Sequence, residues 1–323
     1  MPTMFWEKPM HLRYQADREP QARIVKSRDF PALLPRSSYL ISVARMKSVL
    51  ETINGGAQYL EKRGVEDARR NMEHLLAQRL GCSRMQLYTQ FDKPLEEEQL
   101  APLREALKKR GEGVPLQHLL GEVHFHGRDF ICDGRGLIPR PETEELVEMI
   151  LKDLRPGCLE ILDMGCGSGV LGLSLAAERP ECKVTLADIS PEAIALTREN
   201  AAKLGLSNIE IVESHLFQNL PGRYDLIAAN LPYVASGARE EMSRELSHDP
   251  ALALFSGPEG MDLLRQFIPH AAQQLTPHGF IALEIGYDQA SQVASCLENC
   301  GFTRIEIRKD LAGISRFPFA SLS

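Results

Sequence analysis

Three short motifs along the chain carry residue types that can bind a ligand and act on it. The first, Asp163-Met164-Gly165-Cys166-Gly167-Ser168-Gly169, directly follows an apolar stretch. Its glycines permit a tight turn and let a ligand approach the backbone without interference from a Cβ atom. The spacing matches neither the dinucleotide fingerprint nor the P-loop, which carries a Lys-Ser/Thr pair. We therefore expect a ligand without phosphate groups.

The second motif supplies a carboxylate for that ligand. Asp188 ends the next apolar stretch, 25 residues after Asp163. A carboxylate at this point of an α/β fold accepts hydrogen bonds from ribose hydroxyls and disfavours a phosphate. The competing interpretation is a helix cap before Pro191, and it is weaker because Ser190 already serves as the cap. Asp188 is thus predicted to bind a ribose.

The third motif is Asn230-Leu231-Pro232-Tyr233, which follows another apolar stretch. The amide oxygen of Asn230 can accept a hydrogen bond from a planar NH2 group, and the backbone carbonyl next to Pro232 can accept a second. Tyr233 can stack on the same planar group. Such a site would hold an NH2 nitrogen in place without protonating it. The alternative, a turn with a buried tyrosine, is the weaker interpretation beside the first two motifs.

Apolar strands and helices alternate from residue 159 onward. Strands are expected at 159–164, 183–187, 209–212, 224–229, 280–285, 304–308 and 316–319, and helices at 170–178, 191–204 and 288–300. This alternation predicts an α/β fold with a doubly wound, mostly parallel sheet of seven strands and an antiparallel end. Ligands of such sheets bind where the strand order reverses, beside the first motif. Glu284 faces the same rim, where we expect a structural role.

The preceding part of the chain has a different pattern. Helical spacing is seen over residues 42–53, where Asn54-Gly55-Gly56 is expected to end the helix, and again over 66–80 and 95–110. Aromatic alternation then predicts a β-hairpin. We divide the chain into an N-terminal extension (1–40), a helical substrate-recognition domain (41–120), a hairpin linker (121–136) and a catalytic domain (137–323).

Composition limits the class of protein. The 323 residues are 43% hydrophobic and 25% charged, which excludes a disordered chain or a coiled-coil rod, and no apolar window is long enough to span a membrane. The formal charge is −7, so a nucleic-acid partner is not expected. Seven scattered cysteines without a CxxC pair favour a reducing compartment, the cytoplasm, and no metal site is expected.

The ordered motifs resemble class I S-adenosylmethionine-dependent methyltransferases that methylate NH2 groups, and most specifically the peptide-chain release factor N5-glutamine methyltransferases. The resemblance covers about residues 42 to 323 and is carried further by four stretches: PLQHLLGE at 115–122, LIPRPETE at 137–144, LF at 216–217 and KDLAGISRF at 309–317. It implies S-adenosylmethionine as cofactor, with S-adenosylhomocysteine as product. It also implies a glutamine in the Gly-Gly-Gln loop of class 1 release factors as substrate.

The resemblance assigns roles to individual residues. Cofactor binding falls to Asp163, Gly165, Cys166, Gly167, Ser168, Gly169, Asp188, Ile189, His215, Leu216 and Asn230. Catalysis falls to Asn230, Pro232 and Tyr233, and substrate binding to Asn230, Leu231, Pro232, Tyr233, Phe125 and Arg140. For Phe125 the alternative is a place in the core of the hairpin, and for Arg140 it is a structural ion pair with Glu142. No residue is placed as a strong general base, so catalysis is expected to come from positioning the amide nitrogen.

Two departures from the family pattern keep alternatives open. Leu231 stands where the family has proline, and Asn-Leu-Pro-Tyr is also the form found in ribosomal RNA adenine dimethyltransferases. His215 stands where the family usually has aspartate near the adenine of the cofactor. The alternatives are a glutamine methyltransferase of a ribosomal protein and an N6-adenine methyltransferase acting on nucleic acid. A binding module without activity is a third, disfavoured by the retained motifs.

Overall fold

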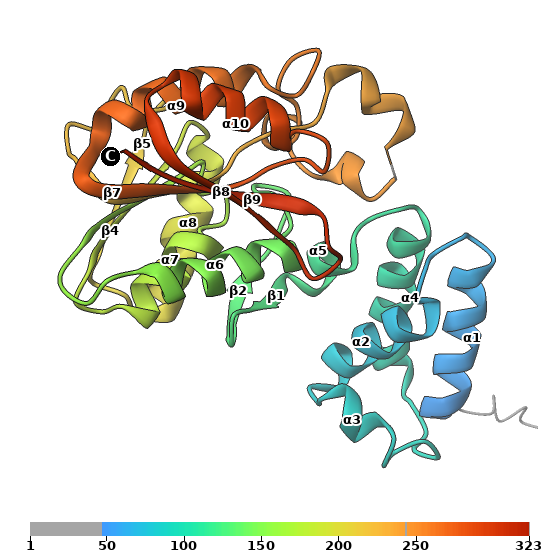
Figure 1. Cartoon of the computed structure of the whole chain (residues 1–323). Helices are drawn as coiled ribbons and strands as arrows, with labels where there is room; N and C mark the ends of the chain where they lie inside the picture. The colour runs from blue at the N-terminus through green and yellow to red at the C-terminus, as the bar shows by residue number, and fades with distance from the viewer. Residues whose placement is uncertain (1–46, 243, 323) are drawn as a thin grey trace, which may run out of the picture. The chain divides into compact units, whose positions relative to one another are not determined.

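The protein is described here by a computed structural model, which covers residues 47–242 and 244–322 (Figure 1). The expected N-terminal extension, residues 1–40, lies outside the described residues. No helix within the described ranges is both long enough and apolar enough to cross a membrane.

From residue 47 onward, five helices precede the hairpin: α1 (Val49–Glu61), α2 (Ala68–Leu80), α3 (Arg84–Leu87), α4 (Glu97–Gly111) and α5 (Leu116–Leu120). Their apolar faces form one core that includes Ile53, Leu76 and Leu87. The serine before α1, Ser48, forms a capping box with Glu51, which satisfies two backbone N–H groups at the start of that helix.

The predicted end of the first helix at Asn54-Gly55-Gly56 is wrong, because α1 continues through these residues to Glu61. Gly56 is buried, and a Cβ atom there would lie 2.2 Å from Sδ of Met72 on α2. The glycine therefore serves the close contact of two helices and does not end one of them.

The expected hairpin is formed by β1 (Glu122–Phe125) and β2 (Arg128–Ile131), which pair in antiparallel register. Helix α6 (Pro141–Asp153) follows, with Pro141 in its first turn, where a missing backbone N–H costs nothing. Neither α6 nor α9 (Asp262–Gln274) was expected from the sequence.

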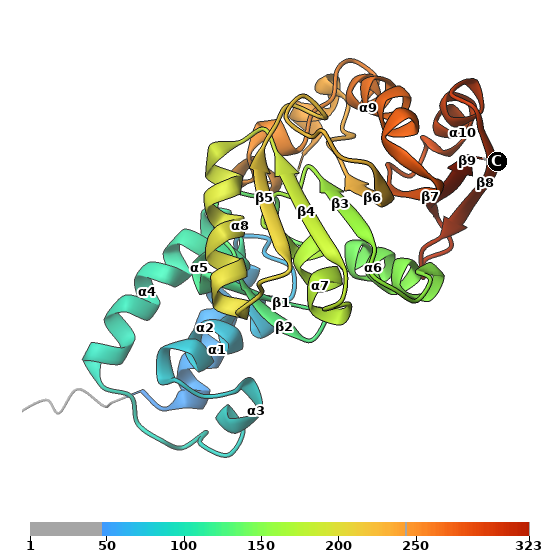
Figure 2. The same cartoon turned by 90° about the vertical axis from the view of Figure 1, so that its left-hand side faces the viewer.

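Seven strands form the main sheet: β3 (Glu160–Met164), β4 (Lys183–Asp188), β5 (Ile209–Glu213), β6 (Tyr224–Asn230), β7 (Leu275–Glu284), β8 (Phe302–Lys309) and β9 (Ser315–Leu322). Their order is β5-β4-β3-β6-β7-β9-β8 (Figure 2). Strands β3 to β7 are parallel, and β9 pairs antiparallel with both β7 and β8. The doubly wound, mostly parallel sheet with an antiparallel end is confirmed.

Helices cover both faces of this sheet. Residues of α6, α7 (Val170–Glu178) and α8 (Pro191–Leu204) share a core with one face, and residues of α9 and α10 (Ala290–Asn299) share a core with the other. Neighbouring residues of β3 alternate between the two cores, with Ile161 in the first and Leu162 in the second. Three short 3₁₀ helices, η1 (Ser236–Glu241), η2 (Leu246–His248) and η3 (Ala251–Ala253), lie between β6 and α9.

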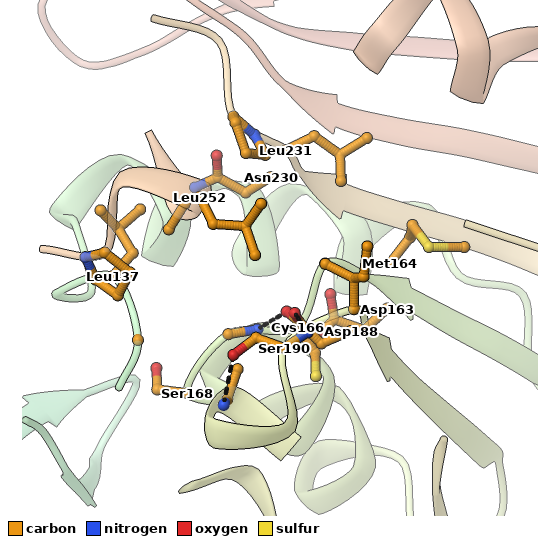
Figure 3. A pocket seen from close by; sticks show the side chains of 18 of the residues that line it. Leu137, Asp163, Met164, Cys166, Ser168, Asp188, Ser190, Asn230, Leu231 and Leu252 are labelled. Carbon is orange, nitrogen blue, oxygen red and sulfur yellow. Dashed lines mark hydrogen bonds between the residues drawn. The ribbon is translucent and has the colours of Figure 1, made fainter. Parts of the chain in front are cut away.

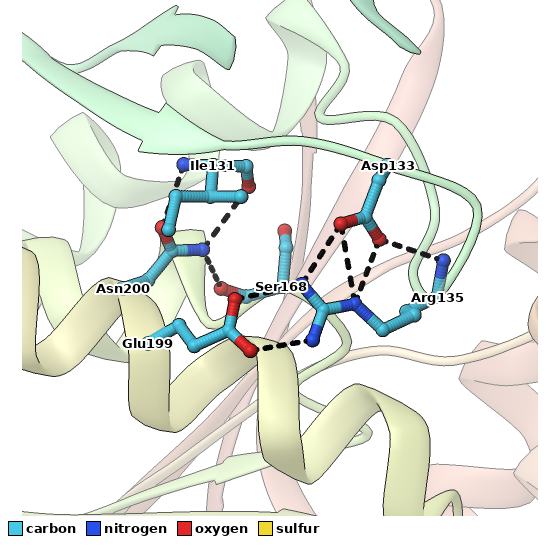
Figure 4. Close-up of polar contacts among 6 residues, drawn as sticks. All are labelled: Ile131, Asp133, Arg135, Ser168, Glu199 and Asn200. Atoms are coloured by element: carbon cyan, nitrogen blue, oxygen red, sulfur yellow. Dashed lines mark hydrogen bonds and ion pairs between the residues drawn. The ribbon is translucent and has the colours of Figure 1, made fainter. Parts of the chain in front are cut away.

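A buried asparagine ties the hairpin to the glycine-rich loop (Figure 4). Asn200 on α8 accepts a hydrogen bond from the backbone nitrogen of Ile131 at 2.6 Å. Its amide donates to the Ile131 carbonyl at 3.2 Å and to the Ser168 carbonyl at 2.9 Å. Nearby, Arg135 donates to both carboxylate oxygens of Asp133 and of Glu199. These contacts fix the segment that leads from the hairpin into the catalytic domain.

We expect Asn200→Ala to lower the free energy of unfolding by about 2–4 kcal/mol, because buried backbone groups that lose their partners cost about 1–3 kcal/mol each. Urea denaturation followed by circular dichroism measures this. Asn54→Ala, which removes an exposed asparagine on α1, is the matched control and should change the value by less than about 0.5 kcal/mol. Equal effects of the two substitutions would contradict the assigned role.

Candidate active site

The glycine-rich loop joins β3 to α7, and the end of β4 holds it in place. Gly165 and Cys166 donate their backbone N–H groups to the carbonyl of Ala187 at 2.8 and 3.0 Å. Gly165 and Gly167 have positive φ angles of 72° and 54°, which glycine adopts without strain. The loop therefore turns back onto β4 within a few residues.

The Asp188 carboxylate organises the same loop from the end of β4. One oxygen accepts from the backbone nitrogen of Gly167, and the other accepts from that of Ser190, each at 2.9 Å. Each carboxylate oxygen can accept more than one hydrogen bond, so acceptor capacity remains for a ligand hydroxyl. Burial raises the pKa of Asp188, whereas the backbone hydrogen bonds from Ser190 and Gly167 act in the opposite direction.

A second carboxylate, Asp163, is the next-to-last residue of β3 and is only 2% exposed. Its Oδ2 atom accepts a hydrogen bond from the backbone nitrogen of Gly172 on α7 at 2.8 Å. Burial, together with the nearby Asp188 charge, raises the pKa of Asp163 to about 7. A Cβ on Gly172 would lie 2.8 Å from atoms of Asp163 and Leu186, so only glycine lets α7 approach this closely.

These loops enclose a cavity at the carboxyl ends of β3, β4 and β6 (Figure 3). Of the residues predicted to bind cofactor, Asp163, Gly165, Cys166, Gly167, Ser168, Asp188, Ile189, His215, Leu216 and Asn230 line it. Asn230 and Leu231 lie across the cavity from Asp188 and Ser190 (Figure 3). Gly169 does not line it: with a φ of 82°, this residue turns the chain into α7.

A second cavity adjoins the first and shares Asn230 with it. Its wall includes Tyr233, Arg140 and Arg316. Leu231 also lines both cavities. The motif Asn230-Leu231-Pro232-Tyr233 therefore stands at the junction, with Pro232 on the side of the first cavity and Tyr233 on the side of the second.

Phe125, like Gly169, is a predicted site residue that lines neither cavity. It lies on β1, is 2% exposed and packs edge to face on Phe130 with ring centroids 6.1 Å apart. Both rings belong to the core beneath α6 and α7 and line neither cavity. The alternation of the hairpin thus turns this ring into the core, and a role of Phe125 in substrate binding stays a prediction.

Arg140 forms an ion pair with Asp249 instead of the Glu142 suggested by the sequence, and Leu231 contacts the glycine-rich loop. Arg140 donates to Asp249 at 3.0 Å. The Leu231 side chain is buried and lies over Gly165, where a Cβ would come within 2.7 Å of Leu231 Cδ2. The leucine thus fills space above the glycine loop, while its backbone stays at the junction of the cavities.

Several residues at the cavities were missed by the sequence analysis. Thr143 on α6 lines the first cavity, as do Leu252 and Ala253 from the segment between β6 and α9. Gly260 lines neither cavity but lies against Tyr233 of the second: it has a φ of 72°, and a Cβ on it would lie 2.1 Å from the Tyr233 carbonyl oxygen. The only signal was Thr143's place in the LIPRPETE stretch; nothing in sequence spacing marks the other three.

The charges around the first cavity suit a ligand that carries positive charge and hydroxyl groups. Its two arginines are paired with carboxylates of other segments, Arg135 with Asp133 and Glu199, and Arg140 with Asp249. The carboxyl groups of Asp163 and Asp188 remain as the acidic groups near the strand ends. Among the described residues, no group of three His, Cys, Asp or Glu side chains could hold a metal ion.

Comparison with known proteins agrees with this arrangement. The family model described as the PrmC N-terminal domain matches residues 51–121, and that of the methyltransferase small domain matches residues 142–260. A release factor glutamine methyltransferase of Geobacter sulfurreducens is 37% identical over 273 residues, 84% of this chain and 94% of that protein.

Two further relatives carry related names. The release factor glutamine methyltransferase of Deinococcus radiodurans is 39% identical over 78% of this chain and 88% of that protein. The human MTRF1L release factor glutamine methyltransferase is 34% identical over 85% of this chain and 88% of that protein. The resemblance drawn from the sequence motifs is confirmed.

We expect Asp188→Ala to weaken the binding of S-adenosylmethionine about 10- to 150-fold, because hydrogen bonds to a charged group contribute about 1.5–3 kcal/mol. Isothermal titration calorimetry of the purified chain measures this. Glu181→Ala is the control, since Glu181 is exposed just before the opposite end of β4 and should leave affinity unchanged. If the affinity of Asp188→Ala stays within threefold of that of the unmodified chain, Asp188 does not bind the cofactor.

Proposed function

The chain belongs to the release factor glutamine methyltransferase family, and we propose that it methylates the side-chain amide of a glutamine in the Gly-Gly-Gln loop of a class 1 release factor. The cofactor is S-adenosylmethionine. The placement of Asn230 at the junction of two cavities carries the proposal. The first cavity would hold the cofactor, and the second would admit the substrate glutamine.

The amide nitrogen of glutamine is a weak nucleophile, so the reaction requires this nitrogen to be correctly oriented and to stay unprotonated. When bound, S-adenosylmethionine supplies an electrophilic methyl group on a sulfonium ion. The Asn230 amide oxygen would accept one N–H of the glutamine amide, and the Leu231 carbonyl, next to Pro232, would accept the other. The glutamine nitrogen is then held with its face toward the methyl group, which converts an encounter into a positioned reaction.

The same acceptors serve the transition state. As the bond between nitrogen and the methyl carbon forms, the nitrogen gains positive charge, and acceptors already in place stabilise it without reorganisation. The nitrogen then releases one proton to water. Tyr233, whose pKa burial raises to about 12, stays neutral at physiological pH and forms an apolar wall of the substrate cavity.

The expected location is the cytoplasm, where release factors act on ribosomes. All seven cysteines are free, which fits a reducing compartment. The formal charge of −7 favours a protein substrate over nucleic acid.

A methyl-transfer assay with labelled cofactor tests the substrate. The substrates are a purified class 1 release factor, the same factor with its loop glutamine changed to alanine, a ribosomal protein fraction and ribosomal RNA. We expect label on the intact factor alone. Label on ribosomal protein or on RNA would replace the proposal with one of the two alternatives.

Asn230→Ala should lower kcat for the release factor about 100- to 1,000-fold, the usual loss when one preorganised transition-state hydrogen bond is removed. The affinity for S-adenosylmethionine, measured by calorimetry, should stay within threefold. Asn208→Ala serves as the control, because Asn208 hydrogen-bonds the loop before β4, away from both cavities. Unchanged turnover of Asn230→Ala would rule out amide positioning by this residue.

A further inference from the structure

A chain of three polar side chains lies behind the junction of the two cavities. Glu284 ends β7 beside Asn230, with which it is paired in the parallel register, and Thr143 lies on α6. The Thr143 hydroxyl donates to Glu284 Oε2 at 2.6 Å, and Asn230 Nδ2 donates to Thr143 Oγ1 at 3.1 Å. Thr143 and Glu284 are 4% and 2% exposed, so neither is a surface contact.

We propose that Thr143 and Glu284 are positioning residues that hold the Asn230 amide with its oxygen, and not its NH2 group, presented to the substrate. The inference rests on the proposed function, because it assumes that Asn230 meets a substrate NH2 group. The sequence indicated no role for Thr143 and only a structural role for Glu284, and the proposal gives both residues a role in the reaction.

The direction of the hydrogen bonds follows from the number of protons. A hydroxyl has one proton, and Thr143 gives it to the carboxylate, which in its ionised form can only accept. The remaining lone pairs of Thr143 Oγ1 can then be met only by a donor, which is the NH2 end of Asn230. Glu284 also accepts a hydrogen bond from the Asn230 side chain. With its NH2 group held in this way, the amide has its oxygen left for the ligand.

The opposite orientation would fail chemically. An inverted Asn230 amide would set its NH2 group against the NH2 group of the substrate, so that two donors would meet without an acceptor. The substrate amide would lose one hydrogen bond and the nitrogen would no longer be held. We call the linked side chains of Glu284, Thr143 and Asn230 the relay. Because the relay excludes this orientation, disrupting it should lower kcat far more than it lowers cofactor affinity.

The relay depends on the charge of Glu284. Burial raises the pKa of Glu284 to about 7, with the nearby Glu142 adding to the rise. The Thr143 hydroxyl, Arg316 and Asn230 act in the opposite direction. A protonated Glu284 can donate to Thr143, whose hydroxyl then donates onward and favours the inverted amide.

The neighbouring charged groups set the pH window. Those that face Glu284 are Glu142 on α6 and Arg316 on β9, while Tyr233 stays neutral because its own pKa is raised to about 12. Because the raised pKa of Glu284 lies near neutrality, the competent, ionised form is gained as the pH rises through about 7. The expected kcat therefore rises between pH 6 and pH 8.

The first test compares two substitutions of Thr143 in the full chain. Thr143→Val keeps the shape but removes the hydroxyl, and we expect kcat for the release factor to fall about 10- to 100-fold. Thr143→Ser restores the hydroxyl and should recover kcat to within threefold. The affinity for S-adenosylmethionine, measured by calorimetry, should stay within threefold in both variants.

Ser174→Ala is the matched control, because Ser174 on α7 is fully buried and its Oγ has no hydrogen-bond partner among the described residues. Its kcat should equal that of the unmodified chain. If Thr143→Val turns over as fast as the unmodified chain, or if Thr143→Ser is as slow as Thr143→Val, the relay is wrong.

The second test uses Glu284→Gln and a readout that needs no substrate. The side-chain NH2 signals of Asn230, identified by their loss in Asn230→Ala, should shift with a single titration near pH 7 in nuclear magnetic resonance spectra. That titration should vanish in Glu284→Gln, and so should the rise of kcat with pH.

The two tests separate the two proposals. If the unmodified chain labels no release factor, the proposed function fails, and the Asn230 signals still decide whether the relay exists. Signals that do not titrate between pH 6 and pH 8, or that titrate equally in Glu284→Gln, would overturn the inference.

Discussion

The position of β3 between β4 and β6 in the sheet is the constraint on which the site depends. Strand β4 pairs with one side of β3 and β6 with the other, so the chain leaves the three strands toward different parts of the fold. A crevice must open where these connections diverge, outside the carboxyl ends of the strands. Asp188 and Asn230 end β4 and β6, and Asp163 is the next-to-last residue of β3, so the register sets the spacing of the three side chains. A slip of one residue would turn each side chain to the other face.

A site at the carboxyl ends of these strands leaves two carboxyl groups buried in the fold. Asp163 on β3 and Glu284 on β7 lie on either side of β6, and burial raises the pKa of each to about 7. A carboxyl with a raised pKa binds a proton in the folded protein between about pH 4 and 7, where the unfolded chain has released it. Its contribution to the free energy of unfolding therefore falls as the pH rises through that interval. The fold tolerates both groups because each accepts a hydrogen bond, from Gly172 and from Thr143.

The sequence predicted the elements whose signals are local. The helix expected at 191–204 coincides with α8, because Ser190 and Pro191 mark its start and Gly205 its end. The glycine-rich loop and the strand ends could also be predicted from the sequence, since apolar runs and turn residues are local features. The second cavity could not be predicted from the sequence. It joins segments far apart in the sequence, from Gln117 to Arg316, and no short pattern records that these will meet.

The errors have the same physical origin. Two adjacent glycines, Gly55 and Gly56, are typical of a helix end, and the sequence analysis therefore ended the helix too early. The Met72 side chain on the next helix explains why a glycine stands at position 56 inside α1. For Phe125 the sequence left a site wall and the hairpin core both open, and the pleat of β1 turns the ring toward Phe130. Thr143 and Glu284 are 141 residues apart, and their hydrogen bond exists only because α6 packs against β7. Tertiary packing, which sequence patterns describe least well, decides each case.

That packing also explains how an enzyme of this kind can act on an amide without a general base. The amide nitrogen of glutamine gains charge only when its lone pair leaves conjugation with the carbonyl, so what it needs from the protein is acceptors for its two protons. A negative charge on Glu284 polarises the Thr143 hydroxyl and, through it, the Asn230 amide, because linked hydrogen bonds strengthen one another in a low-dielectric interior. The oxygen of Asn230 becomes a better acceptor as a result. The carboxylate thus acts on the reaction through Thr143 and Asn230 and not by contact with the reacting nitrogen.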